Sequence, residues 1–212
     1  MIRCDIKEFL KTIPENVTLV AATKYVGPED MEVLLQNGVN NFGENRTESF
    51  LAKYNCLQSK NIVWHFIGHL QRNKATEVIN KIDYLHSLDS LKLAEIIDKK
   101  REKPLKCFVE VSINLEETKN GVPYYETKDF IKELLKFKNI ELVGLMMMAV
   151  KESNENSLDQ QFAKLRILRD EIEKELNIKL PYLSMGMSDD YKEAIKEGAT
   201  HIRLGRILYD LK

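Results

Sequence analysis

Lys24 follows the apolar segment 17–23 directly. A lysine at the end of a buried strand can be partly withdrawn from water, which lowers the pKa of its amine and makes the amine nucleophilic toward an aldehyde. The commoner explanation of a single lysine in this position is a solvated side chain that opens a loop. Lys24 therefore becomes a candidate for covalent chemistry only if a second feature of the chain points to the same chemistry.

Two glycine-containing segments near the other end of the chain have the composition of an anion site. They are SMGMSDD (184–190) and RLGR (203–206). Glycine lets the backbone approach an anion closely, and backbone N–H groups donate hydrogen bonds to it. Ser188 is predicted to be the N-cap of a helix over 189–197, so that its hydroxyl and the adjacent amides face one anion. Each segment alone is explained equally well as a turn without a ligand, but two such loops together favour phosphate.

A reactive lysine beside a phosphate site fits pyridoxal 5′-phosphate, with the aldehyde as a Schiff base on Lys24 and the phosphate on the two glycine segments. Arg203 then falls between them and can face the pyridine nitrogen. An aspartate in that place keeps the nitrogen protonated and the ring a strong electron sink, whereas arginine disfavours the proton. Without this context, a salt bridge from Arg203 to a carboxylate at the rim is an equally good explanation.

Eight short apolar segments alternate with helical patterns along the chain. Most are nearly continuous in apolar residues, as buried parallel strands are. The carboxyl ends of such strands lie on one face, which brings Lys24 and the two glycine segments to the same end of the fold. The predicted strands are 17–23, 41–43, 62–68, 83–88, 105–112, 140–148, 182–186 and 201–205.

The helical patterns complete the prediction of the fold. Helices are predicted over 28–37, which begins with proline and ends before Gly38, over 158–176, and over 191–197 before Gly198. Eight strands, each followed by a helix or the chain end, predict an α/β fold: a single (β/α)₈ TIM-type barrel domain over 1–212. An open, doubly wound sheet is the alternative that periodicity alone does not exclude.

Composition restricts the partners. The chain has 212 residues with a net charge of −1, so it lacks the basic surplus of a nucleic-acid-binding protein. No apolar run approaches the ~20 residues of a spanning helix, and the N-terminus lacks the apolar core of a signal peptide. Cys4, Cys56 and Cys107 are odd in number and far apart, which is typical of a reducing compartment. We expect a cytoplasmic monomer without nucleic-acid or membrane partners.

Two further patterns are interpreted as structural. His65 and His69 are four residues apart, but the sequence WHFIGHL predicts a strand that runs into a glycine turn, so the two imidazoles need not face one way. A core or loop histidine is favoured over a metal ligand, and no metal site is predicted. The run of three methionines at 146–148 is interpreted as barrel packing.

Seven ordered motifs resemble the pyridoxal phosphate homeostasis protein family, which is related to the N-terminal barrel of bacterial alanine racemases. The resemblance runs from about residue 17 to 209, and its last motif departs from the family pattern because Asp210, not glycine, follows Tyr209. The motifs are AATKYV around Lys24, NFGENR (41–46), WHFIGHLQRNK (64–74), HSLDS (86–90), GLMMMAV (144–150), LSMGMSDD (183–190) and IRLGR (202–206).

The resemblance implies a role for six residues toward pyridoxal 5′-phosphate. It implies Lys24 as the Schiff-base lysine, Arg203 at the pyridine nitrogen and Asn45 beside the cofactor. It also implies phosphate contacts from Ser188, Gly205 and Arg206, the last two through backbone N–H groups.

Three functions are compatible with this set. The favoured one is a protein that binds pyridoxal phosphate for vitamin B6 homeostasis, has no catalytic residues of its own and delivers the cofactor to apo enzymes that depend on it. The alternative is an amino-acid racemase or related enzyme, but racemisation needs groups on both faces of the substrate, and the second domain that supplies one of them in alanine racemases is not expected here. A barrel enzyme acting on a sugar phosphate would explain the phosphate site but not Lys24.

Overall fold

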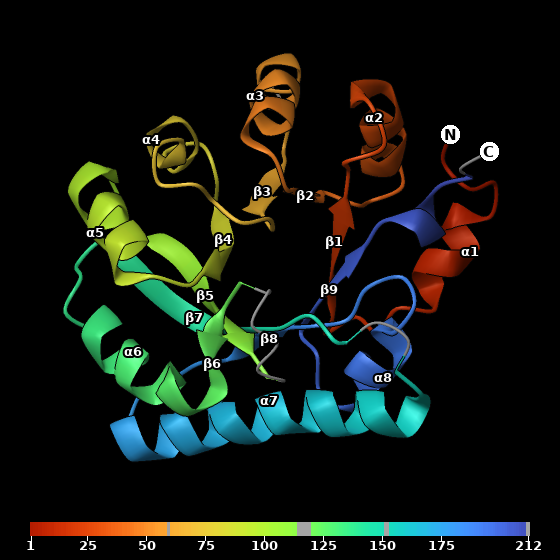
Figure 1. Ribbon diagram of the computed structural model, residues 1–212. Coiled ribbons are helices and arrows are strands. Elements are labelled where there is room, and N and C mark those ends of the chain that lie inside the picture. The colour runs from red at the N-terminus through yellow and green to blue at the C-terminus, as the bar shows by residue number, and fades with distance from the viewer. Residues whose placement is uncertain (59, 114–119, 151–152, 211–212) are drawn as a thin grey trace.

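Eight parallel strands close into a barrel in the computed structural model, in which residues 1–58, 60–113, 120–150 and 153–210 are described (Figure 1). β1 pairs with β2 on one side and with β9 on the other, and pairing of β4 with β5 completes the ring. The predicted barrel is therefore confirmed, and the open sheet is excluded. The barrel strands are β1 (Thr18–Ala22), β2 (Asn41–Glu44), β3 (Val63–Phe66), β4 (Tyr84–Leu88), β5 (Leu105–Ser112), β7 (Ile140–Met146), β8 (Tyr182–Ser184) and β9 (His201–Leu204). A short strand, β6 (Val122–Pro123), pairs in parallel with the last two residues of β5.

Helices surround the barrel and cover its outer face (Figure 1). The predicted helix over 158–176 begins three residues earlier, because the side chain of Asn154 accepts a hydrogen bond from the Ser157 N–H and caps the new first turn. The helices are α1 (Ile6–Lys11), α2 (Pro28–Gln36), α3 (Thr47–Cys56), α4 (Ala75–Val78), α5 (Leu91–Lys100), α6 (Thr127–Leu134), α7 (Glu155–Leu176) and α8 (Tyr191–Lys196), with 3₁₀ turns η1 (Tyr124–Glu126) and η2 (Arg206–Leu208).

The glycines that end α2 and α8, and the apolar residues that pack α7 against the barrel, are those that the sequence pattern predicts. Gly38, at φ +86°, follows α2, and Gly198, at φ +93°, follows α8; only glycine adopts such angles without strain. The apolar stripe of α7 packs onto the barrel through Phe162 and Leu165, which are fully buried. Burial of this kind on every helix, at roughly 25 cal/mol per Å² of apolar surface, is the main force that holds the two layers together.

The two ends of the chain meet beside β9, where α1 lies next to the last strand (Figure 1). Ile2 forms an antiparallel bridge with Tyr209, and the Arg3 N–H donates to the Leu208 carbonyl at 3.1 Å. The departure from the family pattern at Asp210 leaves the ring closed, because β1 and β9 remain paired over four residues of each strand.

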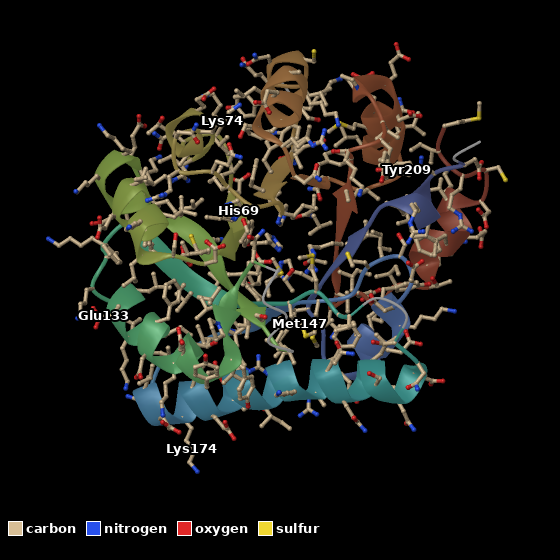
Figure 2. All side chains as sticks on the ribbon, viewed as in Figure 1. His69, Lys74, Glu133, Met147, Lys174 and Tyr209 are labelled. Atoms are coloured by element: carbon tan, nitrogen blue, oxygen red, sulfur yellow. The ribbon has the colours of Figure 1, made fainter. Side chains whose placement is uncertain are left out.

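The run of three methionines at 146–148 is mostly buried. Met146 and Met147 are buried, as predicted for barrel packing, but Met148, two residues beyond the end of β7, is 46% exposed. Figure 2 places Met147 near the centre of the molecule and Glu133 and Lys174 at its edge. Within the described ranges, no helix is both long and apolar enough to cross a membrane.

Candidate cofactor site

Lys24 lies in a turn at the carboxyl end of β1. The Val26 N–H donates to the Thr23 carbonyl at 3.1 Å, so Lys24 and Tyr25 form the two central positions of the turn. The turn directs Lys24 outward, where its side chain is exposed. The predicted withdrawal of its amine from water is therefore wrong for this structure: β1 ends at Ala22, Thr23 is the last buried residue before the turn, and Lys24 is exposed.

The ring of Tyr25 lies beside the Lys24 amine. The Nζ atom lies 4.6 Å from the centre of the phenol ring. The hydrogen bond from Lys24, and the positive charges of Lys24 and Arg206, lower the pKa of the Tyr25 phenol. Lys24, Tyr25 and Arg206 thus share one electrostatic neighbourhood at the mouth of the barrel.

Ser188 faces the end of β9 rather than α8. Its hydroxyl oxygen accepts hydrogen bonds from the backbone N–H groups of Gly205, at 3.2 Å, and Ile207, at 3.4 Å. The prediction that Ser188 caps a helix over 189–197 is wrong. Asp190 immediately precedes α8, and its carboxylate closes a turn by accepting from the Met187 N–H at 2.6 Å, which leaves the Ser188 side chain free to turn toward β9.

Gly186 keeps this loop close to α8. Its φ of +93° favours glycine, and a Cβ there would lie 2.7 Å from the Cβ of Ala194 and 3.0 Å from the Cα of Tyr191. A larger residue would push the loop away from the helix. The position of Ser188, two residues later, therefore depends on this glycine.

The candidate anion site, formed by Ser188 and Gly205, lies next to Lys24 in the barrel, because Gly205 follows β9 and Lys24 follows the neighbouring strand β1. Ala21 pairs with Leu204, and a Cβ added at Gly205 would be 3.6 Å from the Cβ of Ala22. Arg206 is exposed beside them and forms an ion pair with Asp189. Residues 24, 188, 205 and 206 thus lie at the same end of the barrel.

The donor set of this site fits a phosphate monoester. The amides of Gly205 and Ile207 converge on one oxygen atom, which in this structure is the Ser188 hydroxyl. Convergent backbone N–H groups, a hydroxyl and a nearby guanidinium are the groups that bind phosphate in proteins. An exposed primary amine one strand away is the group that an aldehyde requires.

Arg203 lies inside the barrel below this mouth. Its guanidinium donates to the Ser184 hydroxyl at 2.7 Å and to the Met147 carbonyl at 2.8 Å. These bonds go to a hydroxyl and a carbonyl, not to a carboxylate at the rim. Burial lowers the pKa of Arg203 to about 10, partly offset by the charges of Glu110 and Asp190. The side chain is therefore a cation at neutral pH.

Asn45 immediately follows β2 and is half-buried. A Cβ at Gly68 would lie 2.4 Å from the Asn45 carbonyl oxygen and 2.8 Å from its Cβ, so the loop after β3 crosses directly against it. In the part of the chain that the structure describes, no hydrogen bond joins Asn45 to Lys24 or to the anion site. Its predicted place beside the cofactor stays a prediction.

A chain of buried polar groups beneath Arg203 was not predicted. His65 Nδ1 lies 2.9 Å from His86 Nε2, and His86 Nδ1 lies 2.8 Å from the Ser184 hydroxyl, which Arg203 also contacts. Burial holds the pKa of both imidazoles well below the usual value. His69, by contrast, lies at the rim, 3.4 Å from Asp89. The two histidines of the sequence WHFIGHL thus have different roles, a core and a loop residue.

Two buried carboxylates were also missed. Glu44 is the last residue of β2 and Glu110 lies two residues before the end of β5; they are 0% and 4% exposed. Burial, together with the charge of Asp89, raises the pKa of Glu110 to about 7, against the opposing effect of Arg203. A glutamate within or directly after a segment predicted to be a buried strand, as in NFGE and LKCFVEVS, is the signal that could have identified them.

Comparison with known proteins gives a consistent assignment. A family model described as the alanine racemase N-terminal domain matches residues 2–212. The pyridoxal phosphate homeostasis protein of Aquifex aeolicus is 40% identical over 194 residues, which are 90% of this chain and 85% of that protein. The protein of the same name from Synechocystis is 36% identical over 206 residues, 95% and 94% of the two chains.

Solved structures agree with the sequence relatives. PipY of Synechococcus elongatus, solved with pyridoxal phosphate bound, superposes with a TM-score of 0.90 at 29% identity, over 96% of this chain and 99% of PipY. An alanine racemase of Clostridium difficile shares the fold, with a TM-score of 0.83 at 16% identity, over 100% of this chain and 58% of the racemase. On the strength of the sequence relatives above all, this chain belongs to the family of pyridoxal phosphate homeostasis proteins.

Proposed function

We propose that this protein binds pyridoxal 5′-phosphate as a Schiff base on Lys24 and acts in intracellular pyridoxal phosphate (vitamin B6) homeostasis, without a robust catalytic activity of its own. The observation that carries the proposal is the convergence of the Ser188 hydroxyl and the Gly205 and Ile207 amides one strand away from the Lys24 amine. When bound, the cofactor supplies an aldehyde that a primary amine can capture.

Each candidate residue has one task in this proposal. Ser188, Gly205 and Arg206 bind the phosphate, the last two through backbone N–H groups. Arg203 faces the pyridine nitrogen, and Asn45 contacts the cofactor from the end of β2. The whole chain, residues 1–212, acts as one cofactor-binding domain, and we infer a monomer in the cytoplasm.

The buried cation at Arg203 supports a carrier over a racemase. A guanidinium that stays charged at neutral pH disfavours a proton on a ring nitrogen beside it, which weakens the cofactor as an electron sink. Racemisation depends on that sink and on proton donors on both faces of the substrate. The relatives' names, which refer to homeostasis and not to a reaction, support the same choice.

The first test is the visible absorption spectrum with and without added pyridoxal phosphate. We expect a Schiff-base band in the wild type that is lost in Lys24→Ala and kept in Lys74→Ala, since Lys74 pairs with Glu48 on the surface. A wild type that gives no band at saturating cofactor would contradict the proposal and favour a sugar-phosphate enzyme.

A second experiment separates a carrier from an enzyme. The loaded protein is mixed with an apo enzyme that depends on pyridoxal phosphate, and recovery of that enzyme's activity is followed. We expect transfer, together with no measurable interconversion of L- and D-alanine by the loaded protein. Turnover of an amino acid at an enzymatic rate would support the racemase alternative instead.

A further inference from the structure

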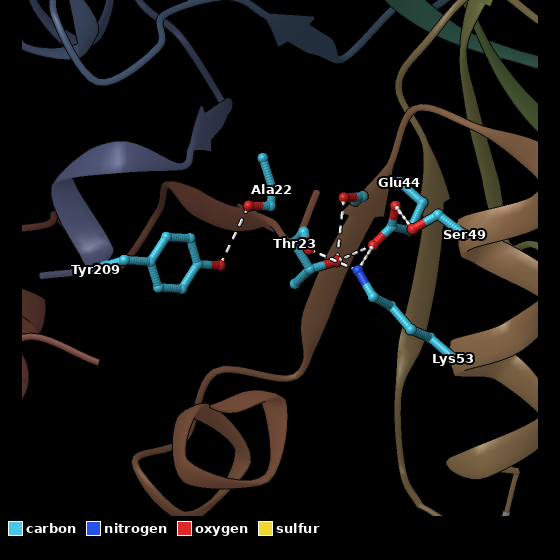
Figure 3. Close-up of polar contacts among 7 residues, drawn as sticks. Ala22, Thr23, Glu44, Ser49, Lys53 and Tyr209 are labelled. Atoms are coloured by element: carbon cyan, nitrogen blue, oxygen red, sulfur yellow. Dashed lines mark hydrogen bonds and ion pairs between the residues drawn. The ribbon is translucent and has the colours of Figure 1, made fainter. Parts of the chain in front are cut away.

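The two backbone carbonyls that precede Lys24 are held by side chains from distant parts of the chain. The Tyr209 hydroxyl donates to the Ala22 carbonyl at 3.1 Å, and the Lys53 Nζ atom donates to the Thr23 carbonyl at 2.5 Å (Figure 3). Tyr209 comes from the end of the chain and Lys53 from α3. The carbonyls of the two residues before Lys24 are therefore held by hydrogen bonds from two distant parts of the chain.

Lys53 is itself anchored by a buried carboxylate. It forms an ion pair with Glu44, whose side chain is 0% exposed, while the side chain of Lys53 is 10% exposed. The Thr23 hydroxyl donates to the same oxygen of Glu44, and the Ser49 hydroxyl donates to the other oxygen at 3.0 Å (Figure 3). The ammonium group thus has a single position, set by β2 and α3 together.

Stability alone does not account for this arrangement. Removing two charges from water is expensive, and apolar residues of the same volume often stabilise a fold as well as a buried ion pair does. Unlike apolar residues, the ion pair constrains the orientation of the Lys53 ammonium group, because its N–H bonds must point at both the Glu44 carboxylate and the Thr23 carbonyl. Since Thr23 also begins the turn that contains Lys24, that orientation determines where the turn leaves the barrel.

We propose that Lys53 and Tyr209 are positioning residues for Lys24: by holding the carbonyls of Thr23 and Ala22, they aim the Lys24 amine at the aldehyde of a ligand whose phosphate occupies the Ser188–Gly205 site. The inference rests on the proposed function. The step that they assist forms a C=N bond between the Lys24 Nζ atom and the aldehyde carbon, and the aldehyde oxygen leaves as water.

A positioning role and a merely structural role predict different results. Misdirecting an amine slows bond formation but leaves the phosphate contacts intact, whereas damage to the barrel weakens every form of binding. Pyridoxine 5′-phosphate separates the two, because it carries the same ring and phosphate but has no aldehyde. Its dissociation constant reports the anion site alone.

Two variants test the proposal. Tyr209→Phe removes one oxygen atom, and Glu44→Gln combined with Lys53→Met removes both charges without leaving one buried alone. The matched controls are Tyr54→Phe, which removes the same atom from α3, and Glu48→Gln combined with Lys74→Met, which removes a surface ion pair. For each variant we measure the rate of bond formation by stopped-flow absorbance, the dissociation constant of pyridoxine 5′-phosphate by calorimetry, and the midpoint of thermal unfolding.

We expect bond formation to slow by about tenfold in the charge-neutralised variant and about threefold in Tyr209→Phe, because small misplacements of a reacting group have effects of at least this size. The dissociation constant of pyridoxine 5′-phosphate should change by less than about twofold in both. The two controls should leave the rate unchanged. Tyr209→Phe keeps the test decisive if the other variant fails to fold, since it removes only a hydroxyl.

Unchanged rates, or rates and affinities that fall together, would overturn the positioning role.

Borohydride reduction of the wild type followed by peptide mapping identifies the modified lysine. Modification of a lysine other than Lys24 overturns the proposed function, and the inference with it. Modification of Lys24 with unchanged rates in both variants overturns the positioning role alone.

Discussion

His65 and His86 are joined by a hydrogen bond of 2.9 Å inside the barrel, although they lie on different strands. The bond belongs to a chain that starts at the Asn41 side-chain oxygen, 2.9 Å from His65 Nε2, and ends at Arg203 through Ser184. The Asn41 oxygen can only accept, so His65 carries its proton on Nε2 and its Nδ1 accepts from the Nε2–H of His86. The Nδ1 atom of His86 then accepts from the Ser184 hydroxyl, whose oxygen accepts from Arg203.

This assignment can be observed by NMR of the ¹⁵N-labelled histidines. We expect His65 and His86 to be neutral Nε2–H tautomers throughout pH 5.5 to 8, because burial lowers the pKa of both imidazoles. A proton on Nδ1 of His86 would contradict the chain as described. His69, which is at the surface, provides the internal comparison.

Among the residues of this hydrogen-bonded network, Ser184 is the one whose substitution should lower the free energy of unfolding most. Ser184→Ala leaves the His86 Nδ1 atom and one N–H of Arg203 without their partner in a buried position. We expect the free energy of unfolding to fall by about 2 kcal/mol, the usual penalty for an unsatisfied buried group, more if the partner is charged. Urea unfolding at pH 7 gives the value, and a loss below about 0.5 kcal/mol would show that water replaces the hydroxyl.

Ser188→Ala should weaken ligand binding without lowering the stability of the fold. The variant removes a hydroxyl that we assign to the phosphate, while the Gly205 and Ile207 amides stay in place. We expect the dissociation constant of pyridoxine 5′-phosphate to rise by about tenfold, equivalent to roughly 1.4 kcal/mol. Ser157→Ala, at the start of α7, is the matched control and should leave the affinity as it is.

Glu110 gives the stability a defined pH dependence. Burial raises the pKa of Glu110 from 4.5 to about 7 in the folded protein, so the folded state binds more protons than the unfolded state between these values. This group therefore makes the fold less stable as the pH rises from 4.5 to 7, by on the order of 3 kcal/mol in total.

Glu110→Gln removes that contribution. We expect the variant to gain stability relative to the wild type at pH 8 and to show no such gain at pH 5, where Glu110 is already protonated in the fold. The comparison of variant with wild type at each pH cancels the titration of all other groups, including His201, whose pKa burial lowers to about 4. An equal difference at the two pH values would show that Glu110 has an ordinary pKa.

Gly186 and Gly27 form a matched pair for a test of the loop after β8. A Cβ at Gly186 would meet two atoms of α8 within 3.0 Å, at a positive φ, whereas a Cβ at Gly27 has no atom within 4 Å. We expect Gly186→Ala to lower the free energy of unfolding by at least about 2 kcal/mol and to weaken phosphate binding, and Gly27→Ala to change stability by less than about 0.5 kcal/mol. Similar effects of the two substitutions would contradict the packing of this loop.

Much of the fold could be predicted from the sequence, because the signals are local. Every predicted strand is present within a few residues, including the short one at 41–43, and the glycines after α2 and α8 end those helices. Apolar runs and helix-terminating residues act over a few positions, so they can be recognised without the tertiary structure. The same logic placed Lys24, Ser188 and Gly205 at one end of the barrel, since parallel strands share an edge.

The sequence predicts the eight strands and the end of them at which the candidate site lies, whereas ring closure and the contacts between atoms at that end follow from the tertiary structure. The Lys24 turn is held by contacts between residues 30 positions apart, Lys53 and Thr23, and 187 positions apart, Tyr209 and Ala22. Ser188 contacts the residues that follow β9 rather than α8 for the same reason. Such contacts depend on how the ring closes and in what register, and periodicity along the chain carries no information about either.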